Sequence, residues 1–475
     1  MTEPMDRLVQ LGLSYLSLDR ASSTLSNGER QRMQLARAVR NRTTGVLYVL
    51  DEPTIGLHPS NVDGVLAIIR ELLADGNSAV VVDHDTRVLG AADHLVEIGP
   101  GAGADGGRVI FQGPIAEASH NPASRIGPYM AGLCRVERAA GESDRGAGID
   151  GRGALYLETN QIHTVRPLSV DIPLGSLTAV TGVSGSGKTT LVLESLVPAL
   201  RARLAGEPLP AHVRDVDGAG ISRVNLIDAT PIGVNVRSTV ATYSGVLDEL
   251  RRAFARTEEA QAAGLKPGAF SYNTGSLRCP TCDGTGQITL DVQFLPDVDI
   301  ECTDCLGSRY GAQASQIRRD GLSLPDIMAM SVDEARLAVR GLKKAGALLE
   351  TLAGLGLGYL TLGEATPALS GGEAQRLKLA SEMGRRQDGT LFVFDEPTIG
   401  LHPDDVQVLL NVLQHLIEHG ATVLVIEHDL DLIRCADWVI DMGPGGGIEG
   451  GRIVAQGTPA DIAANEASVT GRYLR

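Results

Sequence analysis

Two short stretches, Leu369–Glu373 (LSGGE) and Leu391–Thr398 (LFVFDEPT), indicate the fold class of this chain. The first is a Ser-Gly-Gly turn that predicts the start of a helix, whose first backbone N–H groups can bind a phosphate. The second is an apolar run that predicts a strand ending in two carboxylates, Asp395 and Glu396. Because side chains alternate along a strand, one carboxylate can serve a Mg²⁺ while the other faces a water molecule.

The same two stretches occur a second time, as Leu25–Glu29 (LSNGE) and Leu47–Thr54 (LYVLDEPT). Asp395 lies 344 residues after Asp51, and this offset holds without a gap from Leu11 to Gly113. A repeat this long means two copies of one domain, which we call the first copy and the second copy. Strands that alternate with helices in each copy predict α/β domains with a parallel sheet covered on both faces.

The composition bounds the class of protein. The chain has 475 residues, of which 43% are hydrophobic, so it can form about two to four domains with ordinary cores. No apolar run reaches the roughly 18 to 20 residues that a membrane helix needs, so we expect no membrane partner. Met1–Arg7 is polar and shows no secretory signal, and six cysteines, four of them in Cys-x-x-Cys pairs, fit a reducing compartment. We therefore expect a cytoplasmic protein.

The net charge of −16 argues against a uniformly basic surface for nucleic acid. Residues 201–355 carry 17 Lys and Arg and 19 Asp and Glu, so this segment is much nearer neutral than the rest. A local basic groove is compatible with this balance.

Gly182–Thr189 (GVSGSGKT) fits the phosphate-loop pattern G-x-x-x-x-G-K-[ST]. A predicted strand, Leu177–Thr181, precedes it and an apolar helix, Leu191–Leu200, follows, which is the context that the motif needs. Lys188 would neutralise charge on the β- and γ-phosphates, and the Thr189 hydroxyl would ligate Mg²⁺. The predicted ATP-binding residues of this loop are Gly182, Ser184, Gly185, Gly187, Lys188, Thr189 and Thr190.

Three residues downstream of this loop are the candidate catalytic groups. Asp395 would hold Mg²⁺ through its water shell, Glu396 would orient the attacking water, and His428 would contact the γ-phosphate side. The phosphate loop, the Ser-Gly-Gly turn and the acidic strand end are together similar to the Walker A, signature and Walker B motifs of an ABC-type ATPase.

ABC-type sites are composite, because the phosphate loop of one domain faces the signature of the other. In one site, the phosphate loop and Asp395, Glu396 and His428 would face the first-copy signature residues Ser26, Gly28 and Glu29, with Asn27 replacing a usual glycine. The other site would consist of Asp51, Glu52 and His84 with the second-copy signature residues Ser370, Gly372 and Glu373. This chain contains no phosphate loop for that site.

Two Cys-x-x-Cys pairs, Cys279/Cys282 and Cys302/Cys305, each precede a glycine turn. Knuckles of this kind supply four thiolates to a closed structural zinc site, and the spacing makes this reading much stronger than a redox pair. Gln287–Phe294 alternates like a hairpin strand between the pairs. We expect Zn²⁺ to hold that hairpin as a rigid finger.

A duplicated ABC ATPase with a zinc knuckle between Walker A and signature resembles the UvrA family, the damage-sensing ATPases of bacterial nucleotide excision repair and their resistance-conferring relatives. The resemblance runs over nearly all of the chain. The stretches that carry it are Val180–Lys188 (VTGVSGSGK), Ala241–Tyr243, Phe294–Val298 (FLPDV) and Leu369–Leu379.

The resemblance implies tandem ABC-type P-loop ATPase domains, the first incomplete, with an inserted zinc-containing signature domain. We expect the end of the first ATPase domain at 1–133, a linker at 134–153 and the Walker A lobe of the second at 154–200. The inserted signature and zinc-finger domain would cover 201–354, and the signature and Walker B part 355–475.

The implied function is ATP-driven inspection of duplex DNA for damage or distortion, as a homodimer and as part of an excinuclease. The family grips DNA by shape and backbone, and Arg237 matches a family Arg-Ser segment near DNA. One alternative is self-resistance by clearing a DNA-intercalating drug, and another is an inactive fragment that acts only by association.

Three departures from the family pattern bear on this interpretation. The repeat places the first copy's Walker A before Met1, so we expect a truncated chain. The region that the family uses to dock a UvrB-type partner would also lie before Met1, which leaves binding of such a partner an open question. Ala229 stands where the family has a Q-loop glutamine, which puts Mg²⁺ and water contacts in doubt. The predicted hairpin strand Gln287–Phe294 has no Lys or Arg, which weakens the case for tight DNA contact there.

Overall fold

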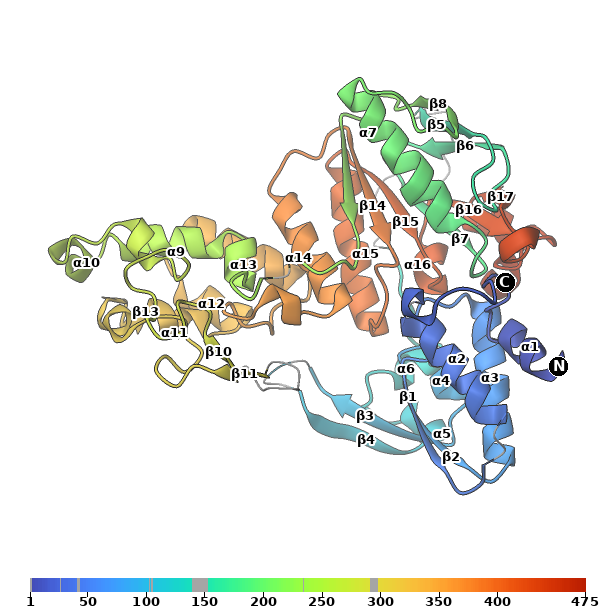
Figure 1. The fold of residues 1–475 in the computed structure, drawn as a ribbon, viewed down its shortest axis with the longest axis horizontal. Helices are drawn as coiled ribbons and strands as arrows, with labels where there is room; N and C mark the ends of the chain where they lie inside the picture. Colours follow the sequence, from blue (N-terminus) through green and yellow to red (C-terminus); the bar gives the residue numbers. More distant parts are fainter. Residues whose placement is uncertain are drawn as a thin grey trace. The chain divides into compact units, whose positions relative to one another are not determined.

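The computed structural model describes residues 2–25, 27–40, 43–101, 103, 106–138, 153–233, 235–290 and 298–475 (Figure 1). The chain divides into two compact units. Unit 1 comprises Met1–Pro100, Gly106–Asp228 and Arg386–Arg475, and unit 2 comprises Gly101–Asp105 and Ala229–Arg385. The domain boundaries given above from the sequence stay a prediction.

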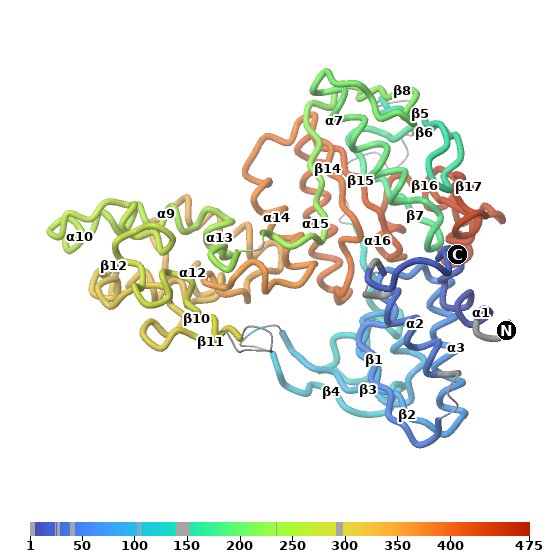
Figure 2. The backbone as a smooth tube through the Cα atoms, in the orientation of Figure 1, coloured from blue at the N-terminus to red at the C-terminus, as the bar shows by residue number. Residues whose placement is uncertain are grey.

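The second copy within unit 1 is built on a six-stranded sheet in the order β17-β16-β7-β15-β14-β9. All neighbours pair in parallel except β17, which runs antiparallel to β16. β7 pairs with both β15 and β16 and so lies between them, and Figure 2 draws these strands as a backbone tube. The strands are β7 (Leu177–Gly182), β9 (Arg223–Ile227), β14 (Thr390–Asp395), β15 (Thr422–Ile426), β16 (Trp438–Gly443) and β17 (Arg452–Gly457).

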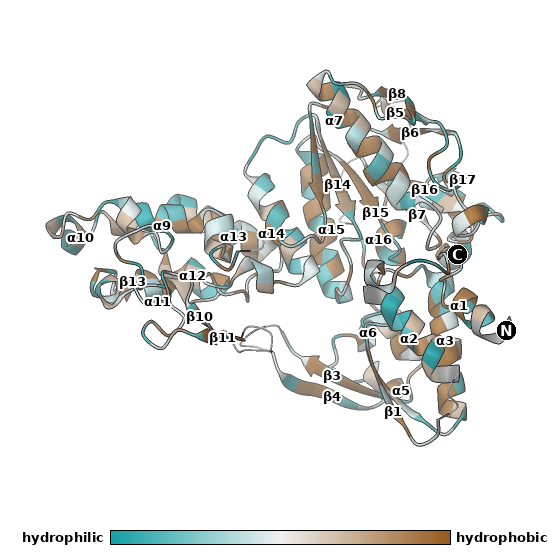
Figure 3. Cartoon of the chain, viewed as in Figure 1, coloured by the Kyte–Doolittle hydropathy of each residue, from teal (hydrophilic) through white to brown (hydrophobic). Residues whose placement is uncertain are grey.

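The central strands are mostly apolar and buried along their whole length, because both faces of a parallel sheet are covered. All six residues of β7 and all five of β15 are buried, and Figure 3 draws β14 and β15 largely in the hydrophobic colour. One face packs against a smaller antiparallel sheet and the helix after the phosphate loop. These elements are β5 (Ala154–Thr159), β6 (Leu168–Pro173), β8 (Val213–Asp217), the π-helical turn η4 (Thr190–Leu196) and α7 (Val197–Ala205).

The first copy repeats the strands of the second copy but not its central sheet. β1 (Leu47–Asp51) pairs in parallel with β2 (Ser78–Val82), and β3 (His94–Gly99) pairs antiparallel with β4 (Arg108–Pro114). Among the described residues these are two separate two-stranded sheets. By the offset of 344 residues they match β14, β15, β16 and β17, and no described strand of the first copy corresponds to β7 or β9.

Helices complete unit 1 and follow the same repeat. The first-copy helices are α1 (Thr2–Gln10), η1 (Ser22–Thr24), α2 (Asn27–Arg40), α3 (Pro59–Ala74), α4 (Thr86–Gly90), α5 (Ile115–Ala118) and α6 (Gly127–Met130). The second-copy helices in this unit are α15 (Pro403–Glu418), α16 (Leu430–Arg434), η8 (Gly447–Glu449), α17 (Pro459–Ala464) and α18 (Gly471–Leu474). The α3 and α15 helices both begin with a proline after a histidine cap, which suits the first turn of a helix.

Unit 2 is mainly helical and carries two short hairpins. Its helices are α8 (Val240–Tyr243), α9 (Val246–Phe254), α10 (Glu258–Ala262), η5 (Pro267–Phe270), η6 (Ala312–Gln316), α11 (Leu324–Met328), α12 (Val332–Ala338), α13 (Lys343–Gly354), η7 (Thr366–Ala368) and α14 (Gly371–Met383). The hairpins pair β10 (Gln287–Leu290) with β11 (Val298–Glu301) and β12 (Arg318–Arg319) with β13 (Leu322–Ser323). The predicted strand Gln287–Phe294 is confirmed to Leu290, and its remainder lies outside the described residues.

No helix in the described part of the chain has the length and apolar character needed to cross a membrane.

Candidate functional site

The phosphate loop leaves the buried strand β7 at Gly182, and a helix begins at Lys188. Gly182 has φ of +129°, and a side chain there would overlap the carbonyl of Met442 on the neighbouring strand, so only glycine fits. The Lys188 ammonium donates to the carbonyls of Gly182 at 2.9 Å and Val183 at 3.1 Å. Burial lowers the pKa of Lys188 to about 8, and nearby Glu396 opposes that shift.

The loop also holds hydroxyl groups that suit a phosphate ligand. Among the described residues, the buried Ser184 and Ser186 Oγ atoms have no hydrogen-bond partner. Buried polar atoms normally have one, so two orphaned hydroxyls in a phosphate loop fit a polar ligand. Thr189 is exposed beside them at the start of the helix, where its hydroxyl is accessible.

The two carboxylates lie at the carboxyl end of β14, as the sequence predicts. Glu396 has φ of +48°, a conformation that non-glycine residues rarely adopt, and strain of this kind clusters at functional sites. Burial raises the pKa of Asp395, and the neighbouring carboxylate Asp228 raises it further. Burial and the charge of Asp395 likewise raise the pKa of Glu396.

His428 follows the next strand, β15, and faces Glu396. Its Nε2 lies 3.7 Å from Glu396 Oε1, and its side chain is 8% exposed. Burial and the Lys188 charge lower the pKa of His428 well below its usual value, so the imidazole is neutral at neutral pH. A neutral ring keeps one N–H donor for a phosphate oxygen.

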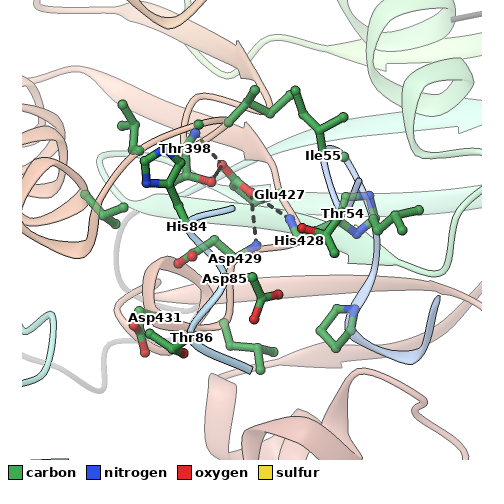
Figure 4. Close-up of a pocket in the computed structure, with 18 of the residues that line it drawn as sticks. Thr54, Ile55, His84, Asp85, Thr86, Thr398, Glu427, His428, Asp429 and Asp431 are labelled. Carbon is green, nitrogen blue, oxygen red and sulfur yellow. Dashed lines mark hydrogen bonds between the residues drawn. The ribbon is translucent and has the colours of Figure 1, made fainter. Parts of the chain in front are cut away.

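A buried carboxylate ties the turn after β14 to the turn that carries His428. Glu427 accepts hydrogen bonds from the backbone and hydroxyl of Thr398 and from the backbone N–H groups of His428 and Asp429 (Figure 4). In the first copy, Asp83 accepts from the Thr54 hydroxyl at 2.6 Å in the same way. These turns line a shared cavity of about 420 Å³ within unit 1.

The first copy brings its signature helix to this site. The α2 helix begins at Asn27, and Glu29 is buried in its first turn. The predicted residue Ser26 lies outside the described residues. Arg32, one turn further along α2, is buried, and its charge acts on both Glu396 and His428. The start of α2 and Glu396, the predicted catalytic carboxylate, are therefore neighbours.

The residues predicted for the site without a phosphate loop belong partly to unit 1 and partly to unit 2. Glu52 repeats the left-handed backbone of Glu396, with φ of +45°, and its Oε1 lies 3.8 Å from His84 Nε2. Asp51 ends β1 and is exposed. In unit 2, Ser370 and Glu373 form a capping box at the start of α14, which includes Gly372. The described part of the first copy contains no phosphate loop.

The four cysteines predicted to bind zinc come together in unit 2. Their Sγ atoms all lie within 4.8 Å of one another, and all four side chains are buried. The Cys279–Cys302 and Cys282–Cys305 sulfur separations are 4.0 and 3.7 Å. A tetrahedron with Zn–S bonds of about 2.3 Å gives about 3.8 Å between sulfurs, so the cluster fits Zn²⁺.

Arg237, the residue predicted to lie near DNA, contacts the zinc knuckle. Its guanidinium donates to the carbonyl and carboxylate of Asp283, at 2.8 and 3.0 Å. Asp283 directly follows Cys282 and also pairs with Arg278. The Arg237 side chain is therefore held against the knuckle in this structure.

Four residues near the phosphate loop were not predicted from the sequence. Asp228 directly follows β9, and its charge acts on Asp395; its position before Ala229 was the only sign of it in the sequence. Asp441 on β16 is buried, accepts from Ser468 and Thr470, and acts on Lys188. His58 and Tyr15 come from the first copy, and only the folded arrangement reveals them.

No protein-family model matches the chain. It is 47% identical over 471 residues to UvrABC system protein A of Synechocystis sp., which covers 98% of this chain and 48% of that protein. It is 44% identical over 477 residues to UvrABC system protein A of Thermus thermophilus, which covers 100% and 50%. The chain thus spans about half the length of the curated relatives it matches.

Solved structures agree with the sequence matches. The crystal structure of UvrA2 from Deinococcus radiodurans matches with a TM-score of 0.90 and 43% identity, covering 99% of this chain and 57% of that one. The archaeal ribosome recycling factor aABCE1, bound to a stalk protein, matches with a TM-score of 0.53 at 19% identity, which shows the fold alone. The predicted α/β fold with tandem ABC-type ATPase domains is confirmed, and the chain belongs to the UvrA family.

Proposed function

We propose that the chain binds and hydrolyses ATP at one composite site and uses that cycle to inspect duplex DNA for damage in nucleotide excision repair. The observation that carries the ATPase part is the convergence of Lys188, Glu396 and His428 with the start of α2 from the first copy. The family membership supports the repair part.

Each group at the site has a distinct task in this proposal. Lys188 neutralises the phosphates, and Glu396, whose raised pKa makes it a better proton acceptor, orients the attacking water. Neutral His428 donates to a γ-phosphate oxygen. Asp395, with Asp228 beside it and the Thr189 hydroxyl nearby in the loop, would hold Mg²⁺, which supplies charge neutralisation between the phosphates.

Two substitutions test the ATPase part. Lys188→Ala should abolish ATP binding, because the phosphates lose their main cation, while Glu396→Gln should keep ATP and lose turnover. Equilibrium binding of a fluorescent ATP analogue and phosphate release measure the two effects. Lys266→Ala, which removes an exposed lysine of unit 2, is the control. Unchanged hydrolysis in both test variants would refute the assignment.

DNA binding is proposed for unit 2. Three arginines, Arg252, Arg256 and Arg319, line a cavity of about 350 Å³ there. Phosphate contacts dominate protein–DNA affinity and release counterions, so a chain with net charge −16 should bind weakly with a shallow salt dependence. We propose a preference for distorted duplex, because deformability is read without base contacts.

Titration into labelled duplexes, with and without a lesion or an intercalator and at several salt concentrations, tests the DNA part. Binding should favour the distorted duplex, require ATP and weaken in Arg237→Ala, which releases Asp283 of the knuckle. Arg385→Ala, at an exposed position two residues after the end of α14, is the charge-matched control. No binding at low salt would remove the repair proposal, and drug release on hydrolysis would favour the resistance function.

We also propose that the chain forms homodimers and acts with a UvrB-type partner in the excinuclease, in a cytoplasmic setting. Sedimentation of the purified chain with and without ATP tests the dimer. A single monomeric species under both conditions would contradict it.

A further inference from the structure

Tyr15 of the first copy joins the signature helix to the phosphate loop of the second copy. It lies in the loop between α1 and α2, and its hydroxyl donates to Glu29 Oε1 at 2.7 Å. Glu29 is 6% exposed and also lies 3.7 Å from Arg20. The Tyr15 hydroxyl is therefore anchored to the first turn of α2.

The ring of Tyr15 lies against the phosphate loop. A methyl group placed on Gly185 would lie 2.6 Å from Tyr15 Cγ, and one on Gly447 would lie 3.3 Å from Tyr15 Cα. Gly447 in turn donates its backbone N–H to the Gly185 carbonyl at 3.0 Å. Because neither of these two hydrogen-bonded glycines has a side chain, Tyr15 fits against both of them.

The repeat contains the same tyrosine a second time. Tyr359, which is 344 residues after Tyr15, donates to Glu373 at 2.5 Å, and a methyl group on Gly103 would lie 2.9 Å from Tyr359 Cβ. Gly103 is the equivalent of Gly447. The pairing of tyrosine with the signature glutamate is therefore intrinsic to each copy, but in the described residues only Tyr15 meets a phosphate loop.

We propose that Tyr15 is a positioning residue that sets the distance between the N-terminus of α2 and the phosphate loop of the second copy. The favourable charge at a helix N-terminus falls off within one turn, so its effect on a phosphate depends on this distance. A displacement of about 1 Å at a catalytic site can cost about 100-fold in rate. The proposal rests on the ATPase function proposed above.

Steady-state ATPase kinetics of the full chain test the role of Tyr15. Tyr15→Ala should lower kcat about 10- to 100-fold while the KM for ATP changes less than about threefold, because Lys188 and the loop still bind the phosphates. Tyr15→Phe keeps the ring and loses only the bond to Glu29, so it should recover most of the spacing and show a smaller loss.

Tyr359→Phe is the matched control, since it breaks the same bond in the copy without a phosphate loop. It should keep kcat within about twofold, and its Tm should shift as much as that of Tyr15→Phe. In a Glu29→Gln background, Tyr15→Phe should cause almost no further loss, because the two residues act as one unit.

The outcomes separate this inference from the ATPase proposal. If the unmodified chain does not hydrolyse ATP, the ATPase proposal itself fails. If it does and Tyr15→Ala keeps its kcat, or Tyr359→Phe loses as much as Tyr15→Phe, the positioning role of Tyr15 is overturned. A rise in KM with unchanged kcat would also overturn it, because that pattern reports ground-state binding alone.

Discussion

The two copies present the same apolar face in opposite environments. Leu47 is 59% exposed and its equivalent Leu391 is 0% exposed; Ile98 is 68% exposed and its equivalent Met442 is 1% exposed. The same contrast separates Val49, Val80, Val82 and Val96 from Val393, Leu424, Ile426 and Ile440. In the second copy this face packs under β5, β6, β8 and α7.

The repeat therefore specifies strands but not their burial. Strand residues keep their apolar character in both copies, while the covering layer determines whether they form a core. The phosphate loop enters with that layer, because β7 both pairs with β15 and β16 and leads into Gly182–Thr189. Core and nucleotide site are therefore gained together in the second copy.

Removal of metal should give the largest effect, and it compares unit 2 with unit 1. Structural zinc contributes about 10 kcal/mol or more to folding in small domains, so chelation should unfold the Cys279–Cys305 knuckle while the core of unit 1 remains. Hydrogen exchange before and after chelation measures this. Elemental analysis should find one zinc per chain, and its absence from protein purified under reducing conditions would refute the site.

A pair of leucine truncations tests the contrast in burial. Leu391→Ala should lower the free energy of unfolding by about 2–5 kcal/mol, because it opens a cavity in a packed core. Leu47→Ala, at the equivalent exposed position, should change it by less than about 0.5 kcal/mol. Urea unfolding of both variants measures these changes. Similar losses of unfolding free energy in the two variants would mean that the face of the first copy is also buried.

A pair of glutamate substitutions tests the contrast in chemistry. Glu396→Gln should lower kcat about 100- to 1,000-fold, as expected for a group that acts in the transition state. Glu52→Gln alters a residue with the same backbone conformation but without a phosphate loop in this chain, and should change kcat less than about threefold. Phosphate-release assays measure both, and equal losses would indicate two active sites.

The pH dependence should show the smallest effect, centred on Lys188. With its pKa lowered to about 8, Lys188 carries its charge below pH 8 and loses it above. ATP affinity should therefore be nearly constant from pH 6.5 to 7.5. Above pH 8 it should fall, with a slope that approaches tenfold per pH unit. Binding titrations across this range measure it, and an affinity that rises above pH 8 would contradict the role of Lys188.

The sequence predicted much of this arrangement because its motifs are local. The strands β7 and β14 end within a residue of where the sequence predicted, at Gly182 and Asp395. The four cysteines meet as their spacing predicts.

Other features depend on distant contacts. The strand β9 is short and half polar, and only its pairing with β14 makes it part of the sheet. The predicted parallel sheet is found in the second copy but is split in the first, because no described strand pairs between β2 and β3. Tyr15 lies against Gly185, 170 residues away, and no periodicity in the sequence indicates such a contact.

The number of ATP molecules bound to each chain distinguishes one complete composite site from two. Isothermal titration of the Glu396→Gln variant, which should retain ATP, is expected to give one site per chain, and Lys188→Ala should remove it. Two equivalent sites per chain, or binding that survives Lys188→Ala, would contradict the account of one complete composite site.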